Sequence, residues 1–306
     1  MYLKYFGLQE KPFGLTPDPK FLFLSAEHRE ALHHLLYGIQ QREGFVVISG
    51  DIGTGKTTLC RALLERLDAR KVVTALILNP LLAEEELLRA ILEEFKLSGK
   101  ATSRKELLDE LNHFLLDNAA TGRTAVLIVD EAQNLSTSCL EQVRLLSNLE
   151  TEKEKLIQII LVGTDELPAK LKLPELRHLE QRISVRYHLH PLDQKETRGY
   201  IQHRLSMAGA AGAISFEKKA NRKMYRLSRG VPRLINMIAD RALVAACLAD
   251  SSTIKRIHVD QGKASLTGET FLGRQPFFSW FQREFHPGFL AAFLAAFVIV
   301  LLMTPG

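Results

Sequence analysis

The chain has 306 residues, of which 46% are hydrophobic and 25% are charged, and its formal net charge is +5. These values predict about two globular domains with a sizeable buried core, and the mild charge permits contact with nucleic acid or an anionic membrane without requiring either. The three cysteines are isolated, which excludes a cysteine-based metal or redox motif and is typical of a reducing cytosol.

The first 40 residues are predicted to form an N-terminal arm followed by a first helix. Pro12, Pro17 and Pro19 prevent a helix within the arm, whose phenylalanines offer apolar anchors. The opening residues lack the long apolar run and cleavage site of a signal peptide. We expect the arm and helix to pack on the nucleotide-binding domain that follows, near the adenine. A structural clasp without ligand contact is the alternative.

Residues 41–191 are predicted to form an α/β domain in which apolar strands alternate with helices. The expected strands are 45–49, 72–78, 125–129, 156–162 and 183–189, and the expected helices include 84–95, 105–116 and 140–149. This alternation predicts a parallel sheet covered by helices on both faces. The last strand alternates apolar and polar residues, which favours an edge position.

A phosphate-binding loop is predicted directly after the first strand. The residues there are Gly50, Asp51, Ile52, Gly53, Thr54, Gly55, Lys56, Thr57 and Thr58, and they match the P-loop pattern. The glycines let several backbone N–H groups point at one anion. Lys56 is expected to reach the β- and γ-phosphates of ATP, while Thr57 offers its hydroxyl to Mg²⁺. We therefore predict ATP and Mg²⁺ as the ligands of this loop.

An acidic pair follows the third strand and resembles a Walker B motif. Asp130 is expected to hold Mg²⁺ beside Thr57, and Glu131 to polarise the attacking water as general base. The carboxyl ends of parallel strands are where an open α/β sheet places its site. Thr164, at the end of the fourth strand, is the candidate for a first sensor that positions the water. A simple strand-ending turn is the alternative at Thr164.

Three arginines are candidates for contacts with the nucleotide phosphates. Arg177 and Arg182 lie between the fourth and fifth strands, from where an arginine can reach the ATP site of a neighbouring subunit and stabilise charge in the transition state. Arg182 is preferred because it directly precedes the fifth strand, and a surface salt bridge is the alternative. Arg233 follows a Gly-Val-Pro sequence and is expected in the first turn of a helix, as a second sensor.

Residues 192–266 are predicted to form a small all-helical lid domain. The expected helices are 194–207, 217–227 and 234–248, and glycines separate them. Residues 267–286 are predicted to be a linker, because they contain two glycines and a proline.

The C-terminal segment 287–305 is predicted to be a transmembrane helix. Residues 287–306 carry no charge, and the length is close to that needed to span a bilayer. Aromatic residues and two arginines precede it, as at a membrane interface with its positive flank inside. A helix buried against the soluble core is the alternative.

The motifs taken together resemble the ExeA/GspA-type secretion ATPases of the AAA+ superfamily, and they are also similar to the pilus-biogenesis ATPases of the MshM type. The resemblance covers residues 1 to about 265. Besides the loop and the acidic pair, it includes the Lys11-Pro12-Phe13 opening, His28, the Leu145 to Glu150 helix, Gln181-Arg182-Ile183 and the Gly230 to Asn236 segment. Where the family often has Gly-Gln-Pro-Glu-Leu, this chain has Thr164 in the second position, so the first-sensor residue stays open.

The resemblance implies a P-loop AAA+ parallel-sheet domain with a helical lid and a C-terminal transmembrane helix. It implies a homo-oligomeric ATPase in the bacterial inner membrane, single-pass, with the ATPase domain in the cytoplasm. Hydrolysis would drive assembly of an envelope secretion, pilus or polysaccharide-export system together with an envelope partner protein. A DNA-associated AAA+ helper that resembles transposition ATPases is the alternative, disfavoured by the apolar C-terminal segment.

Overall fold

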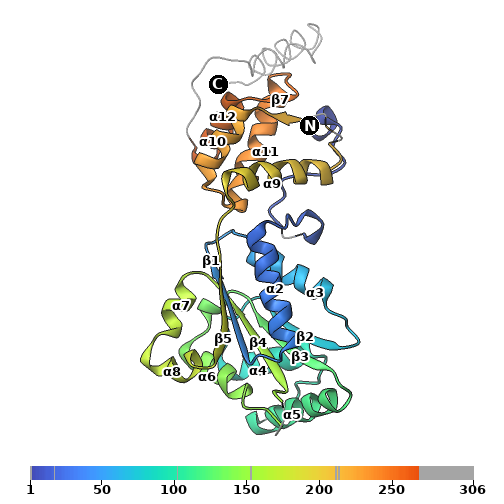
Figure 1. Ribbon diagram of the computed structural model, residues 1–306, viewed down its shortest axis with the longest axis vertical. Coiled ribbons are helices and arrows are strands. Elements are labelled where there is room, and N and C mark those ends of the chain that lie inside the picture. The colour runs from blue at the N-terminus through green and yellow to red at the C-terminus, as the bar shows by residue number, and fades with distance from the viewer. Residues whose placement is uncertain are drawn as a thin grey trace, which may run out of the picture.

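The computed structural model describes residues 2–268, except residues 17, 102, 152, 153, 211 and 213. The chain forms two lobes that are joined after β5 (Figure 1). The sheet lobe contains α2 to β5, and the helical lobe contains α9 to α12. The predicted transmembrane segment 287–305, and the linker apart from its first two residues, lie outside the described residues. Within the part that the structure describes, no helix is both long and apolar enough to cross a membrane.

The sheet lobe is built on one parallel sheet with the strand order β2-β3-β4-β1-β5. The strands are β1 (Phe45–Gly50), β2 (Val72–Ile77), β3 (Thr124–Val129), β4 (Ile157–Val162) and β5 (Ile183–Leu189). All five agree with the predicted strands to within one residue, and β5 occupies an edge as its alternating pattern indicated. The carboxyl ends of β3, β1 and β4 therefore meet at one edge, which is where an open α/β sheet carries its site.

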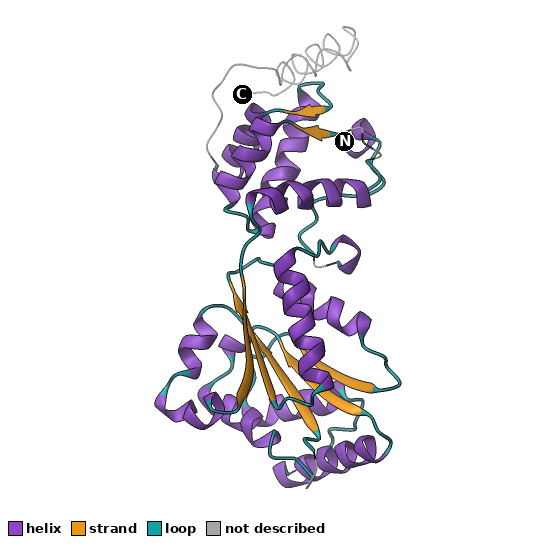
Figure 2. Cartoon of the chain, in the orientation of Figure 1, coloured by secondary structure: helices purple, strands orange, loops and turns teal. Residues whose placement is uncertain are grey.

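Helices cover both faces of this sheet (Figure 2). Phe45 and Val47 of β1 point into one hydrophobic cluster, and Val46 and Ile48 into the other, as the two-residue period of a strand requires. The helices of the lobe and its short 3₁₀ turns are α2 (Ala26–Gln40), α3 (Lys56–Arg66), α4 (Glu84–Glu94), α5 (Arg104–Ala120), η2 (Ala132–Asn134), α6 (Thr137–Leu146), α7 (Glu166–Leu171), η3 (Pro174–Leu176) and α8 (Arg177–Glu180). The clusters place α4 to α8 on the first face and α2 and α3 on the second.

The helical lobe contains α9 (Gln194–Met207), α10 (Lys218–Ser228), α11 (Pro232–Leu248) and α12 (Arg256–Thr267), with a short ribbon of β6 (Ser215–Phe216) and β7 (Thr253–Ile254). The first three helices agree with the predicted ones. The ribbon and α12 were not predicted: each strand of the ribbon has only two residues, and α12 buries few large apolar side chains besides Val259.

The N-terminal arm packs on the helical lobe, which corrects the prediction that it packs on the nucleotide-binding domain. Phe6, Phe13 and Phe21 are buried in the hydrophobic cluster formed by α9, α11 and their neighbours. The arm is also not wholly extended, since it contains α1 (Tyr2–Phe6) and η1 (Pro19–Phe21). A lobe of four helices buries few large side chains by itself, so the aromatic anchors of the arm complete its core. The first helix, α2, packs on the sheet lobe as expected, and η1 at the end of the arm also contacts α3 of that lobe.

Candidate functional site

The predicted P-loop connects the end of β1 to the start of α3 at Lys56. Gly53 and Gly55 have φ angles of +84° and +107°, which L side chains rarely adopt. A Cβ atom at Gly53 would lie 2.6 Å from the Cβ atom of Arg233. The loop therefore needs glycine at Gly53 both for its own turn and for the close approach of the helical lobe.

Lys56 lies beneath the loop and is 6% exposed. Its Nζ atom donates to the carbonyl oxygens of Gly50 at 2.8 Å and Asp51 at 2.9 Å. Burial lowers the pKa of Lys56, while the carboxylates of Glu131 and Asp130 oppose this shift. A largely desolvated ammonium group at the start of a helix, directly after a glycine-rich loop, suits a multiply charged anion such as a triphosphate.

Thr57 and Asp130 meet across the end of the sheet. The Thr57 hydroxyl donates to Oδ2 of Asp130 at 2.6 Å, and the Glu131 backbone N–H donates to Oδ1 at 2.9 Å. Burial raises the pKa of Asp130, although these two hydrogen bonds oppose it. A hydroxyl and a carboxylate are hard oxygen ligands that fit Mg²⁺, which usually takes only one or two protein groups and completes its shell with waters and phosphates. The described residues contain no group of three or more His, Cys, Asp or Glu side chains that could hold a metal ion.

Glu131 is held by a hydrogen-bonded bridge to the end of β4. Its backbone has a φ of +52°, unusual for a residue other than glycine. Gln133 Nε2 donates to Glu131 Oε2 at 2.7 Å, and Gln133 Oε1 accepts from the Thr164 backbone N–H at 3.1 Å. The Thr164 hydroxyl oxygen is buried and has no hydrogen-bond partner among the described residues. Gln133 had no predicted role, and its position two residues after Glu131 is the only signal that points to it.

A cavity of about 310 Å³ lies between the two lobes and brings most of the predicted site residues together. The predicted residues that line it are Ile52, Gly53, Thr54, Gly55, Lys56, Thr57, Thr58, Glu131, Thr164 and Arg233. Gly50, Asp51 and Asp130 are connected to the cavity through the hydrogen bonds of Lys56 and Thr57 rather than by lining it. Arm residues Leu15, Phe21 and Phe23 add apolar walls. One cavity thus combines charged side chains, which suit the phosphates of a nucleotide, with apolar side chains, which suit its base.

Arg233 brings the helical lobe to this cavity. It lies in the first turn of α11, as predicted, and its backbone N–H donates to the Gly53 carbonyl at 3.2 Å. The preceding Gly230 has a φ of +78°, and a Cβ atom there would lie 1.8 Å from the Leu192 carbonyl oxygen. Glycine is therefore required where the chain connects the two lobes at Leu192.

Arg182 lies outside the cavity of its own chain. Its Nη1 atom donates to the Ser147 hydroxyl at 2.7 Å, and Arg177 is the first residue of α8. Neither arginine is among the residues that line the cavity. A contact with ATP by either one would therefore have to be made across a subunit boundary.

His28 of α2 forms a hydrogen bond with the backbone of the P-loop, although no chemical role was predicted for it. Its Nε2 atom lies 3.2 Å from the Thr54 carbonyl oxygen and its Nδ1 atom 2.7 Å from the Ser25 hydroxyl. Because a carbonyl can only accept, Nε2 carries the proton and Nδ1 accepts from Ser25. Burial lowers the pKa of His28, so the neutral ring is favoured.

Arg204 of α9 connects the arm to the helical lobe beside the cavity. It is 7% exposed, donates to the carbonyl oxygens of Pro12 and Gly14 and to the Tyr200 hydroxyl, and lies over the Phe21 ring at 4.7 Å. Tyr200 in turn donates to Asn236 of α11. This buried network fixes the part of the arm that forms the apolar wall of the cavity, and no local sequence pattern indicates it.

Comparison with known proteins identifies similar sequences over most of the described chain. A family model described as an AAA domain matches residues 39–171. The chain is 48% identical to general secretion pathway protein A of Aeromonas hydrophila over 261 residues. This aligned region covers 85% of this chain and 47% of the Aeromonas protein. The chain thus spans about half the length of this curated relative.

Solved structures with the same fold include proteins of low sequence identity. The Drosophila ORC bound to DNA matches with a TM-score of 0.64 and 21% identity, over 86% of this chain and 66% of that one. The Aeropyrum pernix ORC2 protein in its ADPNP and ADP complexes matches with a TM-score of 0.61 and 17% identity, over 87% of this chain and 73% of that one. The Thermotoga maritima RuvB Holliday junction branch-migration motor matches with a TM-score of 0.53 and 19% identity, over 78% of this chain and 68% of that one. At these identities the similarity establishes the fold alone.

Proposed function

This chain is a relative of general secretion pathway protein A with the α/β P-loop AAA+ fold, and we propose that it hydrolyses ATP in the cavity between its two lobes. The observation that carries this proposal is the convergence of Lys56, the Thr57–Asp130 pair, Glu131 and Arg233 on one cavity. Lys56 and the loop amides bind the phosphates, and the apolar wall from the arm receives the base. Thr58, the third residue of α3, lines the same cavity and belongs to the same phosphate site.

Each remaining site residue has a distinct proposed role. Glu131 accepts a proton from the attacking water, and Gln133 orients its carboxylate through the 2.7 Å hydrogen bond. Thr164 positions the same water with its unpartnered hydroxyl. Thr57 and Asp130 would hold Mg²⁺, which when bound would neutralise charge on the phosphates. Arg233 stabilises the phosphates from the helical lobe, so that turnover is coupled to movement of the lobes.

The role of Glu131 is tested with the full chain by measuring ATP turnover and ATP binding together. We expect Glu131→Gln to lower turnover by about two to four orders of magnitude and to retain ATP binding. Glu166→Gln is the matched control, because Glu166 is exposed and lies outside the cavity. Wild-type turnover in Glu131→Gln would reject the proposed base.

We also propose that the protein is a homo-oligomer in which Arg182 completes the ATP site of a neighbouring subunit. The position of Arg182 outside its own cavity supports this arrangement. Subunits with Lys56→Ala and subunits with Arg182→Ala should each be inactive, and a mixture of them should recover part of the turnover. No recovery on mixing would disfavour Arg182 as the contributed arginine.

Tethering to the bacterial inner membrane through residues 287–305, with the ATPase on the cytoplasmic side, is part of the same proposal. It rests on the apolar, uncharged sequence of that segment. The similarity to general secretion pathway protein A further supports a role in secretion, in which hydrolysis drives assembly of an envelope system. Extraction of the full chain from membranes tests the tether: detergent should be needed, whereas release by carbonate or salt would contradict it.

A further inference from the structure

A basic concavity lies on the helical lobe, between the first turns of α9 and α10. Its volume is about 440 Å³, and its lining consists of Gln194, Lys195, Arg198, Lys218, Asn221 and Arg222. Four of these six side chains are cationic and exposed, and none is acidic. We refer to these six residues as the basic groove.

The cations of the basic groove have no salt-bridge partner among the described residues. Elsewhere on the same lobe, Lys223 and Arg256 both pair with Asp260. Carboxylates near the groove have other partners, since Asp193 and Glu196 accept from each other's backbone N–H groups in a capping box at the start of α9. Glu217 precedes α10 without capping it through its side chain.

Two of these cations occupy positions that the helices themselves disfavour. Lys218 is the first residue of α10 and Lys195 the second of α9, where the positive end of a helix repels a cation. By comparison, α4 begins with three glutamates. An anion in the groove would relieve both the mutual repulsion of the four cations and their repulsion by the helix ends.

Charge is also unequally divided along the chain. Residues 192–268 contain 14 lysines and arginines but only 6 aspartates and glutamates. Residues 1–191 contain 24 lysines and arginines and 27 aspartates and glutamates. The helical lobe is thus strongly basic while the rest of the described chain is slightly acidic. The exposed face of α10 extends the positive charge beyond the groove with Lys219, Arg226 and Arg229.

We propose that the basic groove binds the headgroups of anionic phospholipids. A lipid surface is the favoured partner because only 18 residues separate Gly268 from the predicted transmembrane segment. A stretch of that length reaches about 60 Å at most. The basic lobe is therefore the one kept beside the cytoplasmic leaflet, which is negatively charged. This inference rests on the membrane tether of the proposed function and adds a second contact that fixes the orientation of the helical lobe.

The test uses the full chain reconstituted into lipid nanodiscs of phosphatidylcholine, with or without phosphatidylglycerol. A fluorescent donor is attached to Gln202→Cys, an exposed position on α9, in a Cys247→Ser background, while Cys60 and Cys139 are buried. An acceptor dye in the headgroup layer reports the distance of the lobe from the membrane by energy transfer. We expect higher transfer with phosphatidylglycerol and loss of this increase in high salt.

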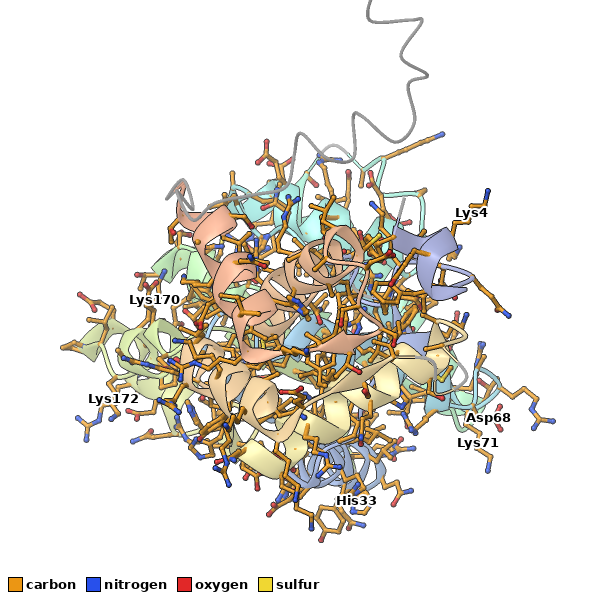
Figure 3. The ribbon with its side chains drawn as sticks, turned by 90° about the horizontal axis from the view of Figure 1, so that it is seen from above. Lys4, His33, Asp68, Lys71, Lys170 and Lys172 are labelled. Atoms are coloured by element: carbon orange, nitrogen blue, oxygen red, sulfur yellow. The ribbon has the colours of Figure 1, made fainter. Side chains whose placement is uncertain are left out.

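Charge-removing variants assign the effect to the groove. The fourfold variant Lys195→Gln/Arg198→Gln/Lys218→Gln/Arg222→Gln should abolish the increase and should weaken lipid contact on the order of a thousandfold. The control removes four exposed lysines from the sheet lobe, Lys71, Lys100, Lys105 and Lys172. Two of them, Lys71 and Lys172, extend away from the molecule on opposite sides (Figure 3). This control should retain the increase, and both variants should retain ATP turnover in detergent.

The outcomes separate the groove from the tether. A chain that fails to remain with the nanodiscs would reject the tether itself. A chain that remains, with energy transfer that is equal in both lipids or unchanged in the groove variant, would overturn the lipid site. Tighter binding of a short duplex DNA than of phosphatidylglycerol nanodiscs at the same salt concentration, lost in the groove variant, would also overturn it in favour of nucleic acid.

Discussion

The two lobes contribute to the candidate site in different ways. The sheet lobe supplies the groups with chemical roles at strand ends: Lys56 after β1, Asp130 and Glu131 after β3, and Thr164 after β4. The helical lobe, together with the arm, supplies Arg233 and the apolar wall. The comparison teaches that the groups proposed to act on ATP lie at the strand ends of the sheet, whereas the contacts proposed to cover the nucleotide come from the helical lobe and the arm.

The largest effect is expected for the phosphate-binding lysine of the sheet lobe. Lys56→Ala should lower kcat/KM for ATP on the order of a thousandfold, because it removes a buried cation that lies at the phosphate position. Steady-state turnover and ATP binding by calorimetry measure this effect. Lys172→Ala, at an exposed site on the same lobe, should leave both values unchanged. Retained ATP affinity in Lys56→Ala would move the phosphate site away from the loop.

The next effect concerns the connection of the arm to the helical lobe. Arg204→Met should lower the free energy of unfolding by about 2–4 kcal/mol, because the carbonyl oxygens of Pro12 and Gly14 lose a buried charged donor. Urea denaturation measures the change. Gln202→Ala, an exposed substitution on the same helix, should change stability by no more than about 0.5 kcal/mol. Equal stability of the two variants would show that the arm is held by its phenylalanines alone.

A smaller effect is expected for Arg233, the cation of α11 that is proposed to contact the phosphates from the helical lobe. Arg233→Ala should raise the KM for ATP about tenfold, the loss of one charged hydrogen bond. Arg241→Ala is the control, because Arg241 is exposed on the same helix and does not line the cavity. If the two substitutions have equal kinetic effects, the helical lobe contributes shape but no charge to the site.

The smallest effect is the dependence of stability on pH through His28. Burial lowers the pKa of His28 below its ordinary value of 6.5, so the unfolded chain binds more protons than the folded one just below that pH. The stabilising contribution is complete well above pH 6.5 and is lost as the pH falls through this value, with a loss of at most about 0.8 kcal/mol at pH 6. Urea denaturation at pH 7.5 and pH 6 should show this loss in the wild type and a smaller one in His28→Gln. Identical losses in both proteins would exclude His28 as the source.

The sheet lobe was predictable because its signals are local. The first four strands are short, mostly apolar runs and the fifth alternates apolar and polar residues, while the P-loop and the Asp130–Glu131 pair follow their strands directly. The position of the arm was not predictable, because Pro12 and Arg204 are far apart in sequence and meet only through the fold. The roles of Gln133 and His28 were also not predictable from sequence. They depend on contacts that only the fold creates, from Gln133 to the Glu131 carboxylate and from His28 to the Thr54 carbonyl oxygen.

The central claim is that both lobes bind one ATP molecule, and a distance between the lobes tests it most directly. Fluorescent labels at Lys172→Cys on the sheet lobe and Gln202→Cys on the helical lobe report that distance by energy transfer, in the Glu131→Gln and Cys247→Ser background. We predict that ATP changes the distance and that Lys56→Ala abolishes the change. Full ATP binding with an unchanged distance would contradict a site that is shared between the lobes.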